Sequence, residues 1–340
     1  MTTHMLAEIR EIPIAAARLL DASNEALREA GRAVRARDPH VLVTVARGSS
    51  DHAASFLKYA VELTAGIPVA SVGPSVASIY GAQLRLKGAA CLAISQSGKS
   101  PDIVAMAEDA RRGGALTVAI TNTPASPLAA ASDHTIDIMA GAEKSVAATK
   151  TFVNSALAGL ALMAHATEDA ALLAALEALP GHFEKAIGCD WNALSGALAS
   201  ASSLFILGRG PSVAIANEAA LKFKETCGMH AEAYSAAEVM HGPLALVTPG
   251  FPVLALAARD RSEPSMAETA DALSAKQAAV FATSDLVKAT ARLPFAATGH
   301  PLTDPLALIV SFYAFVEAFA RQRGLDPDAP RNLKKVTETL

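Results

Sequence analysis

The sequence predicts an α/β protein of two domains, each a mainly parallel sheet flanked by helices in three αβα layers. Short apolar runs rich in β-branched residues end at turns of small residues, and each turn opens a segment with helical spacing. This unit of strand, turn and helix occurs twice, around Arg47-Gly48 and around Arg209-Gly210. Since 340 residues suffice for two domains of roughly 100–200 residues each, we expect an internal duplication of one architecture.

The first half begins with a helical segment and continues with four predicted strands. Pro101 follows the serine-rich turn after the third strand, where it suits the first turn of a helix. Strands that alternate with helices indicate βαβ units and a parallel sheet covered on both faces. The helical segment is predicted at 5–37 and the strands at 41–45, 67–72, 89–94 and 116–120.

The second half follows the same plan. A strand ends at Gly208-Arg209-Gly210, a long helical stretch follows, and two more strands come later. These strands are predicted at 203–207, 251–257 and 279–282, with the helix at 213–225. We expect an N-terminal helical segment over 1–34, domains over 35–175 and 192–325, a bridge between them, and a polar tail over 326–340.

The composition excludes several classes of protein. A formal net charge of −4 argues against a general nucleic-acid surface, which needs a basic excess. The longest apolar run, 305–320, is interrupted by Ser311 and Glu317 and is shorter than the ~20 residues that span a bilayer, so it predicts a buried helix. The N-terminus does not resemble a signal peptide, and three scattered cysteines suit a reducing compartment. We therefore expect a cytoplasmic protein with no membrane partner.

Two serine-rich turns are candidate phosphate sites. Each lies between a strand and a helix, where backbone N–H groups and hydroxyls can cradle a phosphate, and ligands of open α/β sheets lie beyond the carboxyl ends of strands. Both could instead be ordinary polar turns with a helix N-cap. The first comprises Gly48, Ser49 and Ser50, and the second comprises Ser95, Gln96, Ser97, Gly98, Lys99 and Ser100.

The Gly98-Lys99-Ser100 tripeptide is not part of a nucleotide P-loop. That motif requires a glycine five residues before its second glycine, and Ala93 stands there.

The densest cluster of charged and titratable residues lies between 222 and 241. A neighbouring acid and base are what proton transfer on a sugar carbon requires, although a solvated helix face would explain the same residues. Gly242-Pro243 places His241 at a predicted turn, which favours a functional histidine. A zinc site is not expected, since neither histidine lies in an HExxH frame and no cysteine pair supports one. The cluster comprises Lys222, Lys224, Glu225, His230, Glu232, Tyr234, Glu238 and His241.

A second basic group lies in the tail, at Arg331-Asn332-Leu333-Lys334-Lys335. Such a segment could bring an ammonium group to a phosphosugar, or it could be a basic disordered end.

Together these segments resemble the isomerase half of glutamine–fructose-6-phosphate aminotransferase, a member of the SIS (sugar isomerase) family. The resemblance is ordered and covers almost the whole chain, and the segments from 230 to 246 and from 330 to 337 are the most specific. It rests on RGSSDHA (47–53), SQSGKSPD (95–102), TN (121–122), EKSVAATKTF (143–152), LGRG (207–210), EAALKFKE (218–225), HAEAYSAAE (230–238), HGPLAL (241–246) and PRNLKKVT (330–337).

The resemblance implies two SIS domains and a homodimer with the sugar site at the subunit boundary. We expect no cofactor and no metal. The resemblance also implies that Glu225 moves the proton between C1 and C2, that His241 from the partner subunit opens the sugar ring, that Lys222 orients the open chain, and that Lys335 meets C2. The residues implied to hold the phosphate are Ser50, Ser95, Gln96, Ser97 and Ser100, and those implied to line the rest of the pocket are Gly48, Ser49, Val146, Ala147, Arg331 and Lys334.

The sequence departs from the synthase pattern in several places. Lys99 stands where a glutamate is usual, and Ala148 replaces a serine. Lys334 and Val336 flank Lys335 in place of small residues, which leaves open whether Lys335 forms an imine or only clamps phosphate. Two adjacent ammonium groups would lower each other's pKa, as suits an amine nucleophile.

The synthase pattern also begins with a glutaminase domain, and here the chain starts Met1-Thr2 with no counterpart. We therefore expect the reaction to run toward ammonia release, as in SIS-type glucosamine-6-phosphate deaminases. The alternatives are a deaminase or deglycase for another amino- or fructosamine 6-phosphate, and a non-catalytic SIS sensor of phosphosugars.

Overall fold

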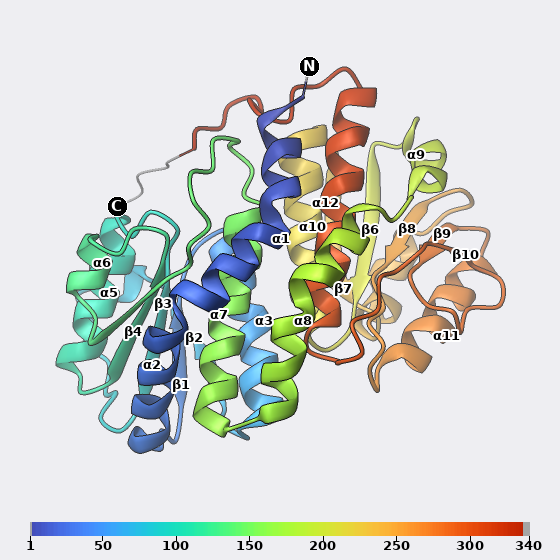
Figure 1. Ribbon diagram of the computed structural model, residues 1–340. Coiled ribbons are helices and arrows are strands. Elements are labelled where there is room, and N and C mark those ends of the chain that lie inside the picture. Colours follow the sequence, from blue (N-terminus) through green and yellow to red (C-terminus); the bar gives the residue numbers. More distant parts are fainter. Residues whose placement is uncertain (1, 336–340) are drawn as a thin grey trace. The chain divides into compact units, whose positions relative to one another are not determined.

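The computed structural model describes residues 2–335, and Figure 1 shows its helices and strands. Two compact units can be distinguished. Residues 12–143 and 150–177 form the first-sheet unit, and residues 2–11, 144–149 and 178–335 form the second-sheet unit.

The first-sheet unit contains a parallel sheet in the order β2-β1-β3-β4-β5. The central strands are fully buried, as expected of a parallel sheet with both faces covered. The strands are β1 (Leu42–Val45), β2 (Val69–Ser71), β3 (Ala90–Ile94), β4 (Leu116–Thr121) and β5 (His134–Asp137).

Helices cover both faces of this sheet. On one face α2 (Asn24–Arg37), α3 (Ser49–Thr64) and α7 (Lys150–Thr167) pack together, and on the other α5 (Pro101–Arg112) packs with the short α4 (Ser75–Ser78) and α6 (Pro127–Ala130). Alanine is frequent where helix meets sheet, which lets the layers approach closely. The core under α5 includes Val43, Val45, Cys91, Ala93, Ile103, Met106 and Ala110.

The second-sheet unit contains a parallel sheet in the order β10-β9-β8-β6-β7. Read from β7, this is the strand order of the first sheet, so β6 corresponds to β1 and β8 to β3. The strands are β6 (Ser203–Gly208), β7 (His230–Ser235), β8 (Pro252–Ala255), β9 (Ala279–Ala282) and β10 (Ala291–Arg292).

In the second-sheet unit α10 (Ser212–Cys227) packs against β6, β7 and α12 (Asp304–Gln322), while α11 (Glu263–Ser274) packs on β9. Aromatic rings join α10 to α12, with Phe223 and Phe312 edge to face at 5.3 Å between centroids. The remaining elements are α9 (Asn192–Leu198), η1 (Glu238–His241) and η2 (Pro243–Leu246), and the helices α1 (His4–Ala22) and α8 (Ala170–Ile187), which cross the boundary between the two units in sequence.

The predicted fold class is confirmed, with differences in detail. The helix predicted over 5–37 is two helices that meet at Ser23, whose hydroxyl donates to the Asp137 carbonyl at 2.7 Å. Three strands, β5, β7 and β10, were not predicted. The apolar run 305–320 is a buried helix, as predicted, and within residues 2–335 no helix could cross a membrane.

Candidate functional site

Both serine-rich turns lie at the carboxyl edge of the first sheet. Val45 of β1 pairs with Ala93 of β3 in parallel register, so the turns that follow these strands leave the sheet side by side. Gly48, with φ of 55°, leads directly into α3 at Ser49. The structure therefore brings together two polar turns that lie far apart in sequence.

The turn after β3 has a tightly defined backbone. The Ser95 hydroxyl accepts from the Gly98 N–H at 3.2 Å, and the Ser97 hydroxyl accepts from the Lys99 N–H at 3.3 Å. Gly98 has φ of 61°, and a Cβ there would lie 2.1 Å from Ser126 Oγ, so both conformation and space require glycine.

The helix after this turn begins without a side-chain cap. Ser100 occupies the N-cap position of α5 but its hydroxyl does not bond to the helix, and Pro101 is the first helical residue. The positive end of the helix dipole and the Ser100 hydroxyl are thus both at the turn, which is the usual environment of a bound anion.

Two of the acid–base candidates, Lys222 and Glu225, lie on one face of α10 together with Glu218, at i+4, i+7 and i. Lys222 Nζ is 3.2 Å from Glu218 Oε1 and 2.5 Å from Glu225 Oε2. Glu218 and Lys222 are fully buried, whereas the Glu225 side chain is 19% exposed. On α12, the Tyr313 hydroxyl donates to Glu218 Oε1 at 3.0 Å. A chain of four polar groups therefore leads from the core to Glu225 near the surface.

Lys222 is a fixed positive charge within this chain. Burial alone lowers the pKa of its ammonium, but the Glu218 and Glu225 carboxylates and their hydrogen bonds outweigh burial, so the pKa is raised above the usual lysine value. The charged lysine can therefore hold the Glu225 carboxylate in one orientation at neutral pH.

Glu225 opens onto a cavity of about 460 Å³ at the end of α10. Its wall mixes positive and negative groups, and the cations Lys224, Arg323 and Arg331 make no ion pair with any residue in 2–335. Burial raises the pKa of the lining thiol Cys227 to about 11, so it is protonated at neutral pH. The lining residues are Lys224 to Gly228, Arg323 to Asp326, and Ala329 to Arg331.

The tail and the segment 144–149 lie together within the second-sheet unit. Lys335 Nζ donates to the Ser145 carbonyl at 2.7 Å, and the Val146 N–H donates to the Asp328 carbonyl at 3.4 Å. Ala147 is buried, and Lys334 is exposed. These predicted pocket residues are thus neighbours, and Arg331 shares the cavity of Glu225.

His241 lies elsewhere. It ends η1 with an exposed side chain, and it does not line the cavity of Glu225. Its predicted role as a residue given by a partner subunit stays a prediction. No cluster of three potential metal ligands occurs among the residues that the structure describes.

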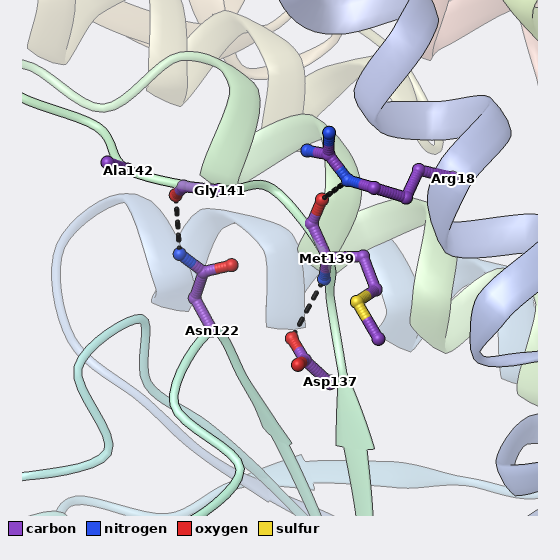
Figure 2. A pocket seen from close by; sticks show the side chains of 6 residues that line it. All are labelled: Arg18, Asn122, Asp137, Met139, Gly141 and Ala142. Atoms are coloured by element: carbon purple, nitrogen blue, oxygen red, sulfur yellow. Dashed lines mark hydrogen bonds between the residues drawn. The ribbon is translucent and has the colours of Figure 1, made fainter.

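A smaller cavity of about 360 Å³ lies at the carboxyl ends of β4 and β5 (Figure 2). Met139 there has φ of 50°, a strained value for its residue type. Arg18 Nε donates to the Met139 carbonyl at 2.7 Å, and Asp137 Oδ1 accepts from the Met139 N–H at 2.9 Å. Asn122 holds the next turn through the Gly141 carbonyl at 2.8 Å. The contacts fix the backbone and were not foreseen from the sequence.

The sequence alone also missed Glu218 and Tyr313. Glu218 lies four residues before Lys222, so helical spacing could have indicated it. Tyr313 lies in an apolar run with no such signal.

A model of the SIS domain matches residues 37–165 and 197–291. The chain belongs to the SIS-domain family. Glutamine–fructose-6-phosphate aminotransferase (isomerizing) from Aeropyrum pernix is 36% identical over 97% of the chain and 56% of the relative, and that from Symbiobacterium thermophilum is 33% identical over 97% and 58%. This SIS-domain protein thus spans little more than half the length of the curated relatives that it matches.

Solved structures agree with this assignment. A protein from Silicibacter pomeroyi DSS-3, provisionally assigned as a phosphosugar isomerase, is 58% identical with a TM-score of 0.94 and covers 96% of the SIS-domain protein and all of itself. The C-terminal domain of glucosamine-fructose-6-phosphate aminotransferase from Francisella tularensis is 25% identical with a TM-score of 0.83, over 97% and 99% of the two chains. Glucosamine-6-phosphate deaminase from Thermotoga maritima shares the fold, at 20% identity and a TM-score of 0.74 over 99% of the SIS-domain protein and 100% of the deaminase.

Proposed function

We propose that this protein is an aminosugar-phosphate isomerase and deaminase that converts glucosamine 6-phosphate and water into fructose 6-phosphate and ammonia. The observation that carries the proposal is Glu225, a partly exposed carboxylate on a cavity wall that is held by the fully buried Lys222. A positioned carboxylate of this kind suits proton transfer between adjacent carbons.

In the proposed reaction the sugar ring opens, with His241 as the proposed proton carrier. Glu225 removes the proton from C2 and returns it to C1, so the carboxylate is regenerated. The resulting ketimine at C2 adds water and loses ammonia, which leaves the C2 ketone of fructose 6-phosphate. Lys222 keeps Glu225 in place, and Lys335 is proposed to meet the C2 centre.

We assign the phosphate to the serine-rich turns of the first sheet, at Ser50, Ser95, Gln96, Ser97 and Ser100. Support comes from the uncapped start of α5, the defined turn at Gly98 and the common edge that both turns share. Relatives named for aminotransfer to fructose 6-phosphate support a phosphosugar substrate.

The test is incubation with glucosamine 6-phosphate, followed by separate assays of ammonium and fructose 6-phosphate in equal amounts. A panel of galactosamine 6-phosphate and fructosamine 6-phosphates identifies a deaminase or deglycase of other specificity, because pocket shape decides among these substrates. Tight binding of fructose 6-phosphate without turnover of any panel member would instead identify a sensor.

A further inference from the structure

Arg47 lies at the edge of the first sheet where both serine-rich turns emerge. Arg47 lies two residues after Val45, the last residue of β1, and Ser95 lies two residues after Ala93, which pairs with Val45. Nε and Nη2 of Arg47 both contact Asp102 Oδ2 in the first turn of α5. The guanidinium is therefore anchored at the start of the helix that the turn 95–100 opens.

This ion pair is buried on one side and open on the other. The Asp102 side chain is fully buried and its Oδ1 accepts from the Ile103 N–H at 2.9 Å, whereas the Arg47 side chain is 44% exposed. Within residues 2–335 the Arg47 side chain has no partner besides Asp102, so the N–H groups of Nη1 remain available. A guanidinium has five N–H donors in a rigid fork, and one carboxylate oxygen does not use them all.

Apart from Lys99, which is exposed, the other donors in the two turns are neutral. Hydroxyls and backbone N–H groups bind an anion but respond weakly to its charge, whereas a guanidinium adds a full positive charge and geometry that matches phosphate. The contacts of the buried Asp102 carboxylate go to Nε and Nη2 of Arg47, so Asp102 does not occupy Nη1.

We propose that Arg47, positioned by Asp102, is the charged member of the phosphate cradle, and that it makes the site select ligands that end in a dianionic phosphomonoester. This inference rests on the proposed phosphate assignment and extends it to a residue outside the predicted set. Asp102 is then a positioning residue, which fixes the guanidinium without touching the ligand.

The test compares wild type with Arg47→Lys and with the double variant Arg47→Met/Asp102→Asn. The first keeps the charge but loses the fork. The second removes both charges, so that no carboxylate is left buried without a partner. Calorimetric titration with fructose 6-phosphate, fructose 6-sulfate and inorganic phosphate measures affinity, and thermal unfolding in the same buffer checks that each variant folds. Lys99→Gln serves as a charge control in the same turn.

We expect both Arg47 variants to bind fructose 6-phosphate about tenfold more weakly, the loss of one charged hydrogen bond. The preference of wild type for phosphate ester over sulfate ester should shrink in the double variant, and Lys99→Gln should cost less. Wild-type affinity in both Arg47 variants, an equal loss in Lys99→Gln, or a wild type that binds no phosphate ester would each overturn the inference. A wild type that binds fructose 6-phosphate tightly but releases no ammonium would refute the proposed reaction and leave the role of Arg47 standing.

Discussion

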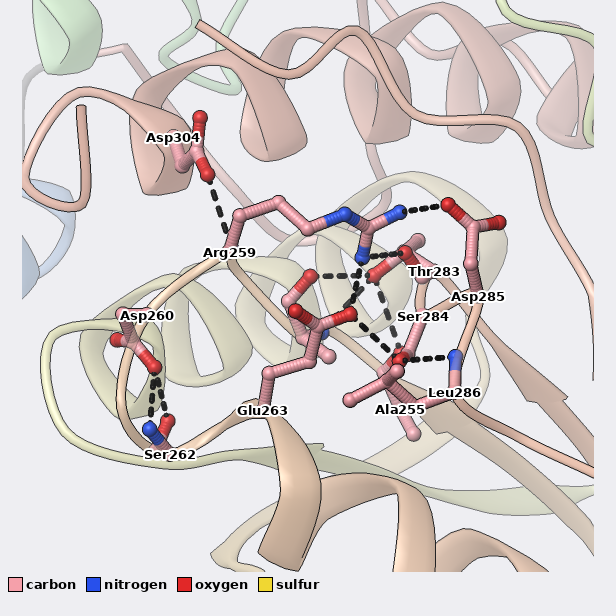
Figure 3. A network of polar contacts seen from close by, with 11 residues as sticks. Ala255, Arg259, Asp260, Ser262, Glu263, Thr283, Ser284, Asp285, Leu286 and Asp304 are labelled. Carbon is pink, nitrogen blue, oxygen red and sulfur yellow. Dashed lines mark hydrogen bonds and ion pairs between the residues drawn. The ribbon is translucent and has the colours of Figure 1, made fainter. Parts of the chain in front are cut away.

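Two turns occupy corresponding places in the two sheets and use their polar groups in opposite ways. The turn after β3 consists of small residues, and the guanidinium beside it, Arg47, keeps donors free on its exposed side. The turn after β8 carries its own arginine, Arg259, which is 27% exposed and whose two terminal nitrogens both bond to the protein (Figure 3).

Arg259 is surrounded by acceptors. It reaches Glu263 at 2.7 Å, the Thr283 carbonyl at 2.8 Å and Asp285 at 2.9 Å, while its N–H donates to Asp304 at 2.9 Å. The comparison shows that the turn after β3 lies beside a guanidinium with exposed donors, whereas the turn after β8 carries a guanidinium that the chain itself surrounds. In the second-sheet unit a chain of buried polar groups lies instead on α10, where Lys222 holds Glu225.

The largest effect should come from Glu225→Gln, which tests whether chemistry belongs to α10 and binding to the first sheet. Loss of a proton-transfer group should lower kcat on glucosamine 6-phosphate by roughly 10²–10⁴-fold. The amide keeps the shape of the side chain, so affinity for fructose 6-phosphate should be retained.

Steady-state kinetics and titration measure the two quantities. The matched control is Glu268→Gln, an exposed carboxylate on α11 that should leave both unchanged. If Glu225→Gln turned over like wild type, the assignment of the proton carrier would be wrong.

Gly98→Ala should distort the serine-rich turn after β3. The added methyl group would clash with Ser126 Oγ, and a φ of 61° is strained for alanine. The free energy of unfolding should therefore fall by about 1–3 kcal/mol, and fructose 6-phosphate should bind about tenfold more weakly. Urea unfolding and titration measure both.

Gly210→Ala is the control for strain alone. It has φ of 58° but no atom within 4 Å of a new Cβ, and it belongs to the second-sheet unit. It should lose less stability and no affinity. Equal losses of affinity in both variants would contradict a phosphate site at the Gly98 turn.

Arg259→Met tests whether the turn after β8 contributes to stability and not to ligand binding. Glu263, whose side chain is 12% exposed, loses its ion pair, so we expect about 1–3 kcal/mol less stability with unchanged affinity for fructose 6-phosphate. Arg47→Lys should show the reverse pattern.

Arg261→Met, an exposed arginine beside it, should change neither quantity. A tenfold loss of affinity in Arg259→Met would show that the turn after β8 also contributes to ligand binding.

Tyr313→Phe should have a smaller effect on kcat. When the Tyr313 hydroxyl is removed, Glu218 relies more on Lys222, and Lys222 then holds Glu225 less well. The loss of one hydrogen bond of about 1 kcal/mol corresponds to roughly a fivefold loss of kcat. The KM should not change.

Ser311→Ala, on the same helix, removes a buried hydroxyl that donates to the Ala186 carbonyl at 2.9 Å. It should lower stability without lowering kcat. If the two variants lost kcat alike, Tyr313 would matter only for packing of α12.

The smallest effect concerns the cysteines. Burial raises the pKa of Cys91 to about 12 and that of Cys227 to about 11, so both are protonated at pH 8. Iodoacetamide should therefore label the partly exposed Cys189 first and leave activity intact. Labelling of Cys227 should accelerate as pH rises toward 11, since only the thiolate reacts; fast labelling at pH 8, seen by mass spectrometry, would show that the cavity opens to it.

The sequence predicted most strands because buried strands of a parallel sheet are short, β-branched and apolar. β7 was missed because His230, Glu232 and Tyr234 alternate with small residues at an edge strand, and β10 has only two residues. The division of the first helix at Ser23 depends on a contact with Asp137, which lies 114 positions away.

The serine-rich turns could be predicted because each directly follows a strand and opens a helix. The long-range partners that position the charged groups could not. Arg47 and Asp102 are 55 positions apart, and Glu218 and Tyr313 are 95 apart. Such pairs depend on how helices pack on a sheet or on one another, which no local pattern encodes.

The second-sheet unit is built from three separate stretches of the chain, 2–11, 144–149 and 178–335. Asp328 accepts from the N–H groups of His4 and Met5, both at 2.7 Å, and Glu8 accepts from the Ser145 N–H at 3.3 Å. If the chain were divided between the two SIS matches, neither fragment would contain the whole second-sheet unit. The fragment from 178 onward would lack residues 2–11 and 144–149, which bond to its own tail, so we expect that it cannot be expressed as an independent module.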